Sequence, residues 1–228
     1  MKNTFKKLFI SFTVLSLTAC GSTTMQDNTF AAKENKDFTK YTNQLVVEYA
    51  ENDYTTMHQF FEHPEDYGID INNVDVSLGE FYTDNTEEIK EDQKELNKFN
   101  RSTLDKTQQT IYDELKYENE LSLKAENKKF QYLNNCWSTM SGLHQSLISV
   151  FSEYILRSEK DIQDLITLIN DVPRYTNDVL EYTKKQADKN TLQFDYDSVT
   201  QDIQDVINNK ENSSITSALN NAIDALNL

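Results

Sequence analysis

Few residues in this chain have the type and spacing that catalysis or metal binding requires. The histidines are His58, His63 and His144, and the sequence contains no His-Glu-x-x-His or Cys-x-x-Cys pattern of the kind that zinc sites commonly use. Because His58 and His63 are separated by five positions, they fall on different faces of a helix. Nucleophile elbows and phosphate-binding loops need glycines, of which the chain has 4. We therefore predict no catalytic residue, no metal ligand and no cofactor.

Cys20 lies in a sequence context that is typical of a modified cysteine. It ends the run Leu17-Thr18-Ala19-Cys20 and is followed by Gly21, an arrangement typical of a bacterial lipobox, in which the thiol receives a diacylglyceryl group before cleavage. Upstream lie a basic segment and an apolar stretch over residues 8–19. Such a stretch rises about 18 Å as a helix, less than the roughly 30 Å of a bilayer core, which favours a signal peptide over a permanent span.

These features predict a signal peptide over residues 1–19 and a flexible tether over residues 20–36 that starts with lipidated Cys20. The membrane is then a partner through the lipid on Cys20, and the protein lies on the extracytoplasmic face of the cell membrane. The alternative is an ordinary signal peptide cut near Ala19, with Cys20 incidental. Cys136 remains without an intramolecular partner. A small half-buried thiol beside Trp137 is a simpler interpretation of it than a catalytic cysteine.

The composition indicates a folded, acidic, helical domain. Hydrophobic residues make up 37% of the chain and include 12 Phe and 12 Tyr, whereas Gly and Pro number only 4 and 2, which disfavours a turn-rich β fold. The formal net charge is −16, and removing a signal segment with three lysines and no acids lowers it by three to −19. Such a surface repels nucleic acid, so no nucleic-acid partner is expected. The tyrosines could line a glycan or peptide groove, but their helical spacing favours core positions, as for Tyr41, Tyr49, Tyr154 and Tyr175.

Apolar periodicity and capping residues predict the elements of a helical domain over residues 37–228. Asp37 is the expected N-cap of the first helix, Asp84 with Glu87 and Ser158 with Asp161 resemble capping boxes, and Pro173 suits the first turn of a new helix. Residues 69–82 are expected to form a long ordered loop or a short extended piece, and residues 127–142 an irregular segment. The prediction is an all-α bundle of seven to nine helices with one long irregular loop. Helices are expected to begin at residues 37, 55 and 84 and to cover residues 103–126, 143–157, 158–169, 173–182, 198–210 and 214–226.

Three blocks, in their order and spacing, resemble bacterial lipoproteins of domain-of-unknown-function family 885. The resemblance covers about residues 37–190. The first block contains His-Pro-Glu-Asp-Tyr-Gly-Ile over residues 63–69, and the second is Leu-Asp-Lys-Thr-Gln-Gln-Thr-Ile-Tyr-Asp-Glu-Leu over residues 104–115. The third comprises Gly142, Leu147, Glu153-Tyr154, Arg157 and Asp161, with Ile148 where the family tends to have proline.

The resemblance implies a helical, zincin-like fold related to metallocarboxypeptidases, with zinc ligands in a His-Glu-x-x-His-type helix of the C-terminal half. Members of that family are longer than 228 residues, so this chain is expected to correspond to their N-terminal region. No zinc or catalytic residue of the family can therefore be assigned to a position of this chain.

Three functional hypotheses follow from the sequence. The first is a membrane-anchored helical lipoprotein that is catalytically silent alone, as a truncated product or a remnant retained for binding. The second is one half of a split zinc metallopeptidase, whose other half or partner protein docks on the apolar stripe of the final helix. The third is a surface binding or scaffold lipoprotein with its own ligand. The stripe of the final helix consists of Ile215, Leu219, Ile223 and Leu226.

Overall fold

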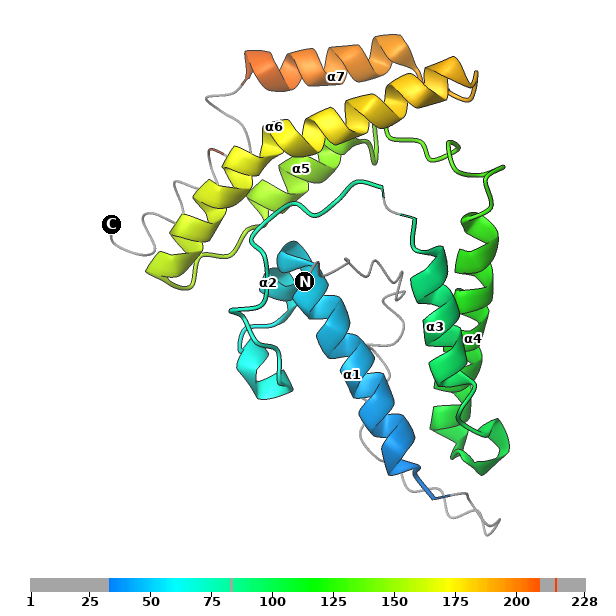
Figure 1. Cartoon of the computed structure of the whole chain (residues 1–228). Coiled ribbons are helices and arrows are strands. Elements are labelled where there is room, and N and C mark those ends of the chain that lie inside the picture. The colour runs from blue at the N-terminus through cyan, green and yellow to red at the C-terminus, as the bar shows by residue number, and fades with distance from the viewer. Residues whose placement is uncertain (1–32, 83, 210–215, 217–228) are drawn as a thin grey trace.

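A computed structural model describes residues 33–82, 84–209 and 216. Every regular element in these residues is helical, which confirms the all-α prediction (Figure 1). The seven α-helices of the described part are α1 (Lys36–Asn52), α2 (Tyr54–Phe60), α3 (Thr86–Leu96), α4 (Lys106–Ala125), α5 (Leu143–Ser152), α6 (Glu159–Asp188) and α7 (Tyr196–Asn208). Two short 3₁₀ helices, η1 (Pro64–Tyr67) and η2 (Arg101–Thr103), follow α2 and α3.

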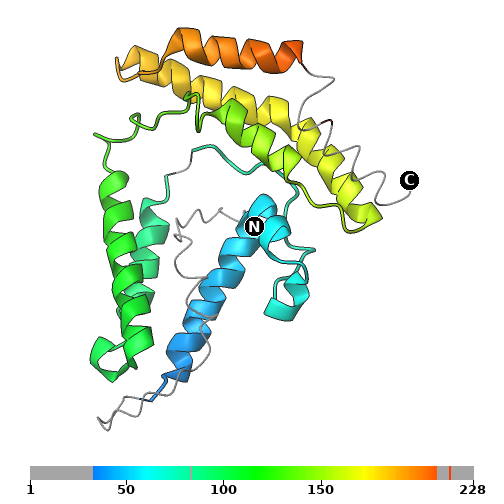
Figure 2. The ribbon, with the colours of Figure 1, turned by 180° about the vertical axis from the view of Figure 1, so that it is seen from behind.

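The helices form two groups that α1 connects. In both views α5, α6 and α7 lie side by side, while α3 and α4 form a separate antiparallel pair (Figures 1 and 2). Helix α1 runs from the η2 end of this pair toward α2, which lies against the α5–α6 layer. Two long connections, residues 61–82 with 84–85 and residues 126–142, join the groups. Their described residues are irregular apart from η1.

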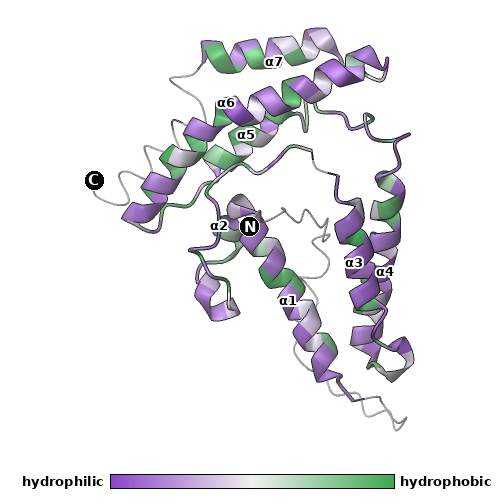
Figure 3. Ribbon diagram, viewed as in Figure 1, coloured by the Kyte–Doolittle hydropathy of each residue, from purple (hydrophilic) through white to green (hydrophobic). Residues whose placement is uncertain are grey.

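Three hydrophobic clusters hold these elements together, and hydrophobic segments alternate with polar ones along the helices (Figure 3). One cluster joins α1 to the α3–α4 pair through Phe38, Leu45, Leu96, Leu104, Tyr112 and Leu115. A second joins α1, α2 and the following loop to α5 and α6 through Ala50, Tyr54, Met57, Phe61, Ile69, Val74, Phe151, Leu165 and Leu168. The third fixes the 126–142 connection on α6 through Cys136, Leu143, Val179 and Tyr182. Burial of these side chains provides most of the stabilising free energy.

Helix starts follow local capping, with two corrections. The N-cap of α1 is Asn35 rather than the predicted Asp37: its Oδ1 accepts from the backbone N–H groups of Asp37 and Phe38 at 3.1 Å. Gln108 of α4 holds Asn35 in place, since its amide bonds both the N–H and the carbonyl of Asn35 at 2.9 Å. This contact between distant segments decides the start of α1.

The second correction concerns α3. Asp84 and Glu87 do not form a capping box, because Asn85 is the N-cap and caps no N–H with its side chain. The Asp84 carboxylate instead bonds the N–H and hydroxyl of Thr86 at 3.0 and 2.6 Å. The capping box predicted at the start of α6, between Ser158 and Asp161, is confirmed.

The predicted helix boundary at Pro173 is wrong, since α6 continues through it. Pro173 lacks an N–H and leaves the carbonyl four residues earlier without its helical partner. Both Pro173 and Ile169 lie on the exposed side of α6, where water can bond that carbonyl. Leu168 before the proline and Val179 after it are both fully buried, in different clusters. Packing on both sides thus outweighs the loss of one hydrogen bond.

The end of α5 also differs from the prediction. The helix stops at Ser152, five residues before the predicted Arg157. Residues 153–158 have no helical structure, and they contribute backbone groups to contacts with α2 and α6 that a helix would have used internally. At the other end, Gly142 precedes α5 where a Cβ would lie 2.6 Å from backbone atoms of Ser138, so only glycine fits.

Two sequence predictions fall on residues that the structure does not describe. They are the lipobox with Cys20, and the final helix over residues 214–226 apart from Thr216. Among the described helices, none combines the length and the apolar character needed to cross a bilayer.

Candidate functional site

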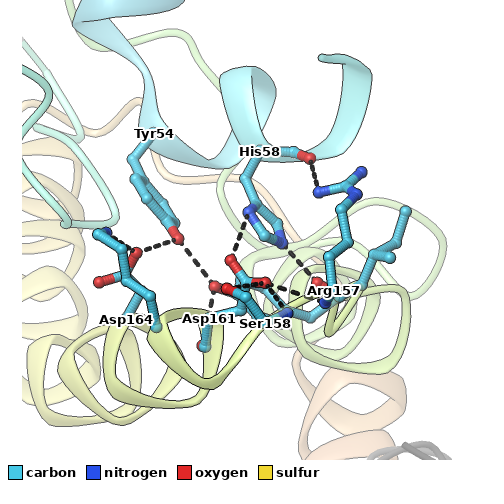
Figure 4. Close-up of polar contacts among 9 residues, drawn as sticks. Tyr54, His58, Arg157, Ser158, Asp161 and Asp164 are labelled. Atoms are coloured by element: carbon cyan, nitrogen blue, oxygen red, sulfur yellow. Dashed lines mark hydrogen bonds and ion pairs between the residues drawn. The ribbon is translucent and has the colours of Figure 1, made fainter. Parts of the chain in front are cut away.

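In two places of the described chain, polar side chains from segments distant in sequence lie around a hollow. The first, which we call the histidine cluster, joins α2 to the segment between α5 and α6 and to the first turns of α6 (Figure 4). It consists of Tyr54, His58, Tyr154, Arg157, Ser158, Asp161 and Asp164. The second, which we call the tyrosine pocket, is a hollow on α6 lined by Glu80, Phe81, Tyr82, Gln131, Tyr132, Arg174, Asp178, Glu181, Tyr182 and Lys185.

The imidazole of His58 is held at one nitrogen and on its ring faces. Its Nε2 donates to the carbonyl of Ile155 at 2.7 Å, which places the proton of the neutral ring on Nε2. Its Nδ1 lies 3.7 Å from Oδ1 of Asp161. The ring is stacked on Tyr154 at a centroid distance of 4.2 Å, and Tyr54 stacks at 5.6 Å. Nε2 and the ring faces are therefore engaged within the protein, whereas Nδ1 carries the lone pair of the neutral ring and makes no hydrogen bond to Asp161.

The electrostatic balance keeps His58 neutral. Burial lowers the pKa of the imidazole below its usual value, and the nearby Arg157 guanidinium acts in the same direction. The Ile155 carbonyl and the carboxylate of Asp161 oppose this shift, but burial has the larger effect. A neutral histidine with its proton fixed toward a carbonyl cannot give that proton to a substrate without breaking the contact.

Asp161 organises the start of α6. Its Oδ2 accepts from the backbone N–H groups of Arg157 and Ser158 at 2.9 and 2.7 Å, and from the Ser158 hydroxyl at 2.9 Å (Figure 4). The guanidinium of Arg157 donates to the carbonyl of His58 at 2.9 Å. The segment before α6 is thus tied to α2 in both directions.

Two tyrosine hydroxyls complete the histidine cluster. The hydroxyl of Tyr54 donates to the buried carboxylate of Asp164 at 2.9 Å and lies 2.8 Å from the hydroxyl of Tyr154. The Tyr154 hydroxyl donates to the carbonyl of Asp161 at 3.1 Å. Burial raises the pKa of both tyrosines, so they remain protonated donors. Lys160 pairs with Asp164 on its solvent side.

The hollow beside the histidine cluster is small. It has a volume of about 110 Å³ and is lined by Thr55, His58, Gln59, Ser149, Val150, Glu153 and Tyr154. Sites for small molecules usually measure roughly 300–1,000 Å³. The bonds of the cluster run between α2 and the start of α6: Arg157 donates to the carbonyl of His58, and Tyr54 donates to Asp164. The histidine cluster therefore works as a clamp between α2 and α6.

The tyrosine pocket is larger and has a different construction. Its volume is about 420 Å³, and three segments distant in sequence form its walls: residues 80–82, residues 131–132 and α6. Tyr182 of α6 is its buried centre, with rings of Phe81, Tyr82 and Tyr132 at centroid distances of 5.3, 5.6 and 5.4 Å. The Tyr182 hydroxyl donates to the carbonyl of Gln131 at 2.9 Å and accepts from the N–H of Asn134 at 3.3 Å. These contacts fix the two loops on α6.

The charged groups of the tyrosine pocket fall into two classes. Arg174 is fully committed: its guanidinium binds both carboxylate oxygens of Asp171, one of Asp178 and the carbonyl of Gly79, at 2.6 to 2.8 Å. Glu80, Glu181 and Lys185 are exposed, and within the described part of the chain none of them has an ion pair or hydrogen bond to its charged group. These three groups are available to a ligand.

The residues singled out from the sequence are dispersed in the structure. His63 is 65% exposed and lies 3.5 Å from Glu65, so it is separate from buried His58, as their spacing predicted. His144 of α5 points toward α7, with its Nε2 3.8 Å from Asp202. Cys136 is buried, and burial raises the pKa of its thiol to about 11, in line with an unreactive structural cysteine. Across the described residues no group of three or more metal-binding side chains is found.

The tyrosines gave a mixed result. Tyr41, Tyr154 and Tyr175 pack against hydrophobic clusters, which confirms the core interpretation for them. Tyr82 and Tyr132, which line the tyrosine pocket, were not identified from the sequence. The available signal was aromatic residues within the irregular segments 69–82 and 127–142, where no helical stripe accounts for them.

Comparison with known proteins gives one match. The sequence model of the family described as "Bacterial protein of unknown function (DUF885)" matches residues 72–227. The match begins in the loop after η1, so it includes every residue of the tyrosine pocket, whereas Tyr54 and His58 lie before it. No curated protein and no solved structure matches the chain significantly.

Proposed function

Since the chain belongs to the DUF885 family of bacterial proteins of unknown function, we propose that it is a lipid-anchored binding protein on the extracytoplasmic face of the cell membrane. In this proposal its helical domain corresponds to the non-catalytic N-terminal region of zincin-like peptidase relatives. The observation that carries the binding role is the contrast between the two polar sites: Tyr54, Arg157 and Nε2 of His58 are bonded within the protein, while the larger tyrosine pocket keeps three charged groups unpaired.

The anchoring part of the proposal rests on the lipobox. Leu17, Ala19 and Cys20 occupy the positions that lipoprotein processing needs, after a basic segment and an apolar stretch. Two or more acyl chains give lasting membrane attachment, which a single chain does not.

Membrane fractionation tests the anchor, because the sequence provides a matched control. The chain has two cysteines, so we expect Cys20→Ala to release the protein from the membrane fraction and Cys136→Ala to leave it there. Mass spectrometry of the N-terminal peptide should show a lipid-modified Cys20. An unmodified N-terminus at residue 20 would instead show ordinary signal-peptide cleavage and reject the anchor.

The non-catalytic part is tested on the purified protein. We expect no peptide cleavage when the chain is supplied with zinc and a mixture of peptides. Stoichiometric zinc retained after gel filtration, together with peptide cleavage, would overturn this part. The relation to zincin-like peptidases would be supported by an experimental structure whose helices superpose on such a peptidase.

The second hypothesis, one half of a split zinc metallopeptidase, has its own support. The predicted stripe of Ile215, Leu219, Ile223 and Leu226 is the kind of apolar helix face that a partner covers. Reading the gene beyond the codon for Leu228 tests it. A neighbouring reading frame with a His-Glu-x-x-His helix, whose product co-purifies with this chain and binds zinc, would favour this hypothesis over a solitary binding protein.

A further inference from the structure

We propose that the tyrosine pocket binds a small organic cation, with the ammonium group over the ring of Tyr82 and beside the carboxylates of Glu80 and Glu181. This inference deepens the proposed function, because it gives the binding protein a ligand class. It rests on the proposed function only for the cellular location at which the protein meets its ligand. It combines three features of the pocket: its size and rigidity, its unpaired charges and its aromatic surface.

The pocket has the dimensions and fixed walls of a ligand site. Its volume of about 420 Å³ falls within the usual range for small-molecule sites, roughly 300–1,000 Å³. Its walls are held by hydrogen bonds from Tyr182 to the 131–134 segment and from Arg174 to Gly79. A preformed cavity needs little ordering when a ligand binds.

The unpaired charges favour a positive ligand. Three acids and two bases line the pocket, and Arg174 is already neutralised by Asp171 and Asp178. What remains is two free carboxylates, from Glu80 and Glu181, and one free ammonium, from Lys185. The whole chain carries a formal net charge of −16, so its field attracts cations and repels anions.

The aromatic surface supplies the second half of cation recognition. The ring of Tyr82 belongs to a side chain that is 40% exposed, and cations bind over tyrosine faces within about 6 Å of the ring centre. The chain itself shows this preference, since Nζ of Lys189 lies 5.0 Å from the ring centre of Tyr132. Tyr132 thus has a cation from the chain, whereas no such contact is found for Tyr82 among the described residues.

Choline and its uncharged isostere 3,3-dimethylbutan-1-ol test the inference directly. The two molecules have nearly the same shape and differ in the charge, so a preference for choline isolates the contribution of the cation. We expect calorimetric titration of the full chain, kept in a neutral non-choline detergent, to show saturable binding of choline and at least about tenfold weaker binding of the isostere. Equal affinities, or no choline binding, would overturn the proposal, as would preferential binding of a neutral sugar.

Substitutions locate the binding to this pocket. Tyr82→Leu removes the aromatic face and should weaken choline binding about five- to tenfold, whereas Tyr82→Phe keeps the face and should retain most of the affinity. Tyr196→Leu is the matched control, because Tyr196 of α7 is 66% exposed and lies outside the pocket. A loss of affinity in the Tyr196 variant equal to that in the Tyr82 variant would reject the assigned site.

A cation of this class could be free or part of a lipid headgroup. Vesicles of phosphatidylcholine and of phosphatidylglycerol separate these sources when they are offered to the Cys20→Ala chain, which has no lipid anchor of its own. Binding only of free choline indicates a soluble ligand, and Tyr82-dependent binding to phosphatidylcholine vesicles indicates a headgroup. Failure of the Cys20 fractionation test would reject the location alone, whereas failure of choline binding would reject the pocket's ligand alone.

Discussion

In the histidine cluster the polar groups face one another, whereas in the tyrosine pocket several of them face solvent. The cluster buries Tyr54, His58 and Asp164 with 4 to 8% of each residue exposed, and gives every one of them a polar partner within the protein. The pocket leaves Glu80, Glu181 and Lys185 exposed beside an aromatic wall. Both places contain hydroxyls, carboxylates and a basic group, so residue type does not separate them.

The two arrangements lower different free energies: the histidine cluster lowers the free energy of folding, and the tyrosine pocket lowers the free energy of ligand binding. A buried polar group must be bonded, because leaving it without a partner costs about 1–3 kcal/mol. The histidine cluster meets that requirement and so contributes to the stability of the α2–α6 contact. The exposed charges of the tyrosine pocket contribute little to stability, and their interactions remain free for a ligand. Stability and binding measurements should therefore separate the two places.

Asp161→Ala should have the largest effect on stability. The substitution removes the acceptor for the N–H groups of Arg157 and Ser158 and the carboxylate beside His58. We expect the free energy of unfolding to fall by about 2–3 kcal/mol in urea titrations. Glu159→Ala, in the same turn of α6 but exposed, is the control and should change it by less than about 0.5 kcal/mol. Equal losses would show that helix charge, not the cluster, is responsible.

His58 should make the protein less stable in mild acid. Burial holds its pKa in the folded state below the ordinary value of 6.5, so the unfolded chain takes up the proton more readily. Neutral His58 therefore makes its full contribution to the free energy of unfolding above about pH 6.5, and this contribution is lost as the pH falls below that value. Urea midpoints measured at about pH 7.5 and about pH 5.5 should differ more in the wild type than in His58→Gln. His63→Gln, which removes an exposed histidine, should keep the wild-type difference.

The sequence allowed the helical class and most helices to be predicted, because capping and apolar periodicity are local. The capping box of Ser158 and Asp161 and the irregular segment 127–142 are such cases. Predictions failed where contacts between distant segments decide the outcome. Asn35 caps α1 because Gln108 holds it, and α6 passes through Pro173 because it is packed at both ends.

Neither polar site could be assembled from local patterns. The hydroxyls of Tyr54 and Tyr154 meet across 100 positions of sequence, and Tyr54 reaches Asp164 across 110. Tyr154 was correctly predicted to pack in the core, but helical spacing carries no information about its hydrogen bonds. The tyrosine pocket likewise depends on two irregular segments that dock on α6, and periodicity does not apply to such segments.

Tyr182→Phe tests whether hydrogen bonds fix the walls of the tyrosine pocket, as they fix the histidine cluster. The substitution keeps the ring but removes the donor to the Gln131 carbonyl and the acceptor for the Asn134 N–H. We expect a loss of about 1 kcal/mol in the free energy of unfolding, together with faster hydrogen exchange of the Asn134 amide. Tyr196→Phe, which alters an exposed hydroxyl, should change neither. Unchanged exchange at Asn134 would show that the loop is held without this contact.

Glu181→Gln should separate binding from stability most clearly. Glu181 lies on the exposed side of α6 and its carboxylate bonds no other described residue, so the substitution should change the free energy of unfolding by less than about 0.5 kcal/mol. In the same variant the affinity for choline should fall, because one of the two free carboxylates is lost, and the fall should shrink as salt is added. A variant that loses stability but keeps its choline affinity would mean that the charges of the tyrosine pocket serve the fold, as those of the histidine cluster do.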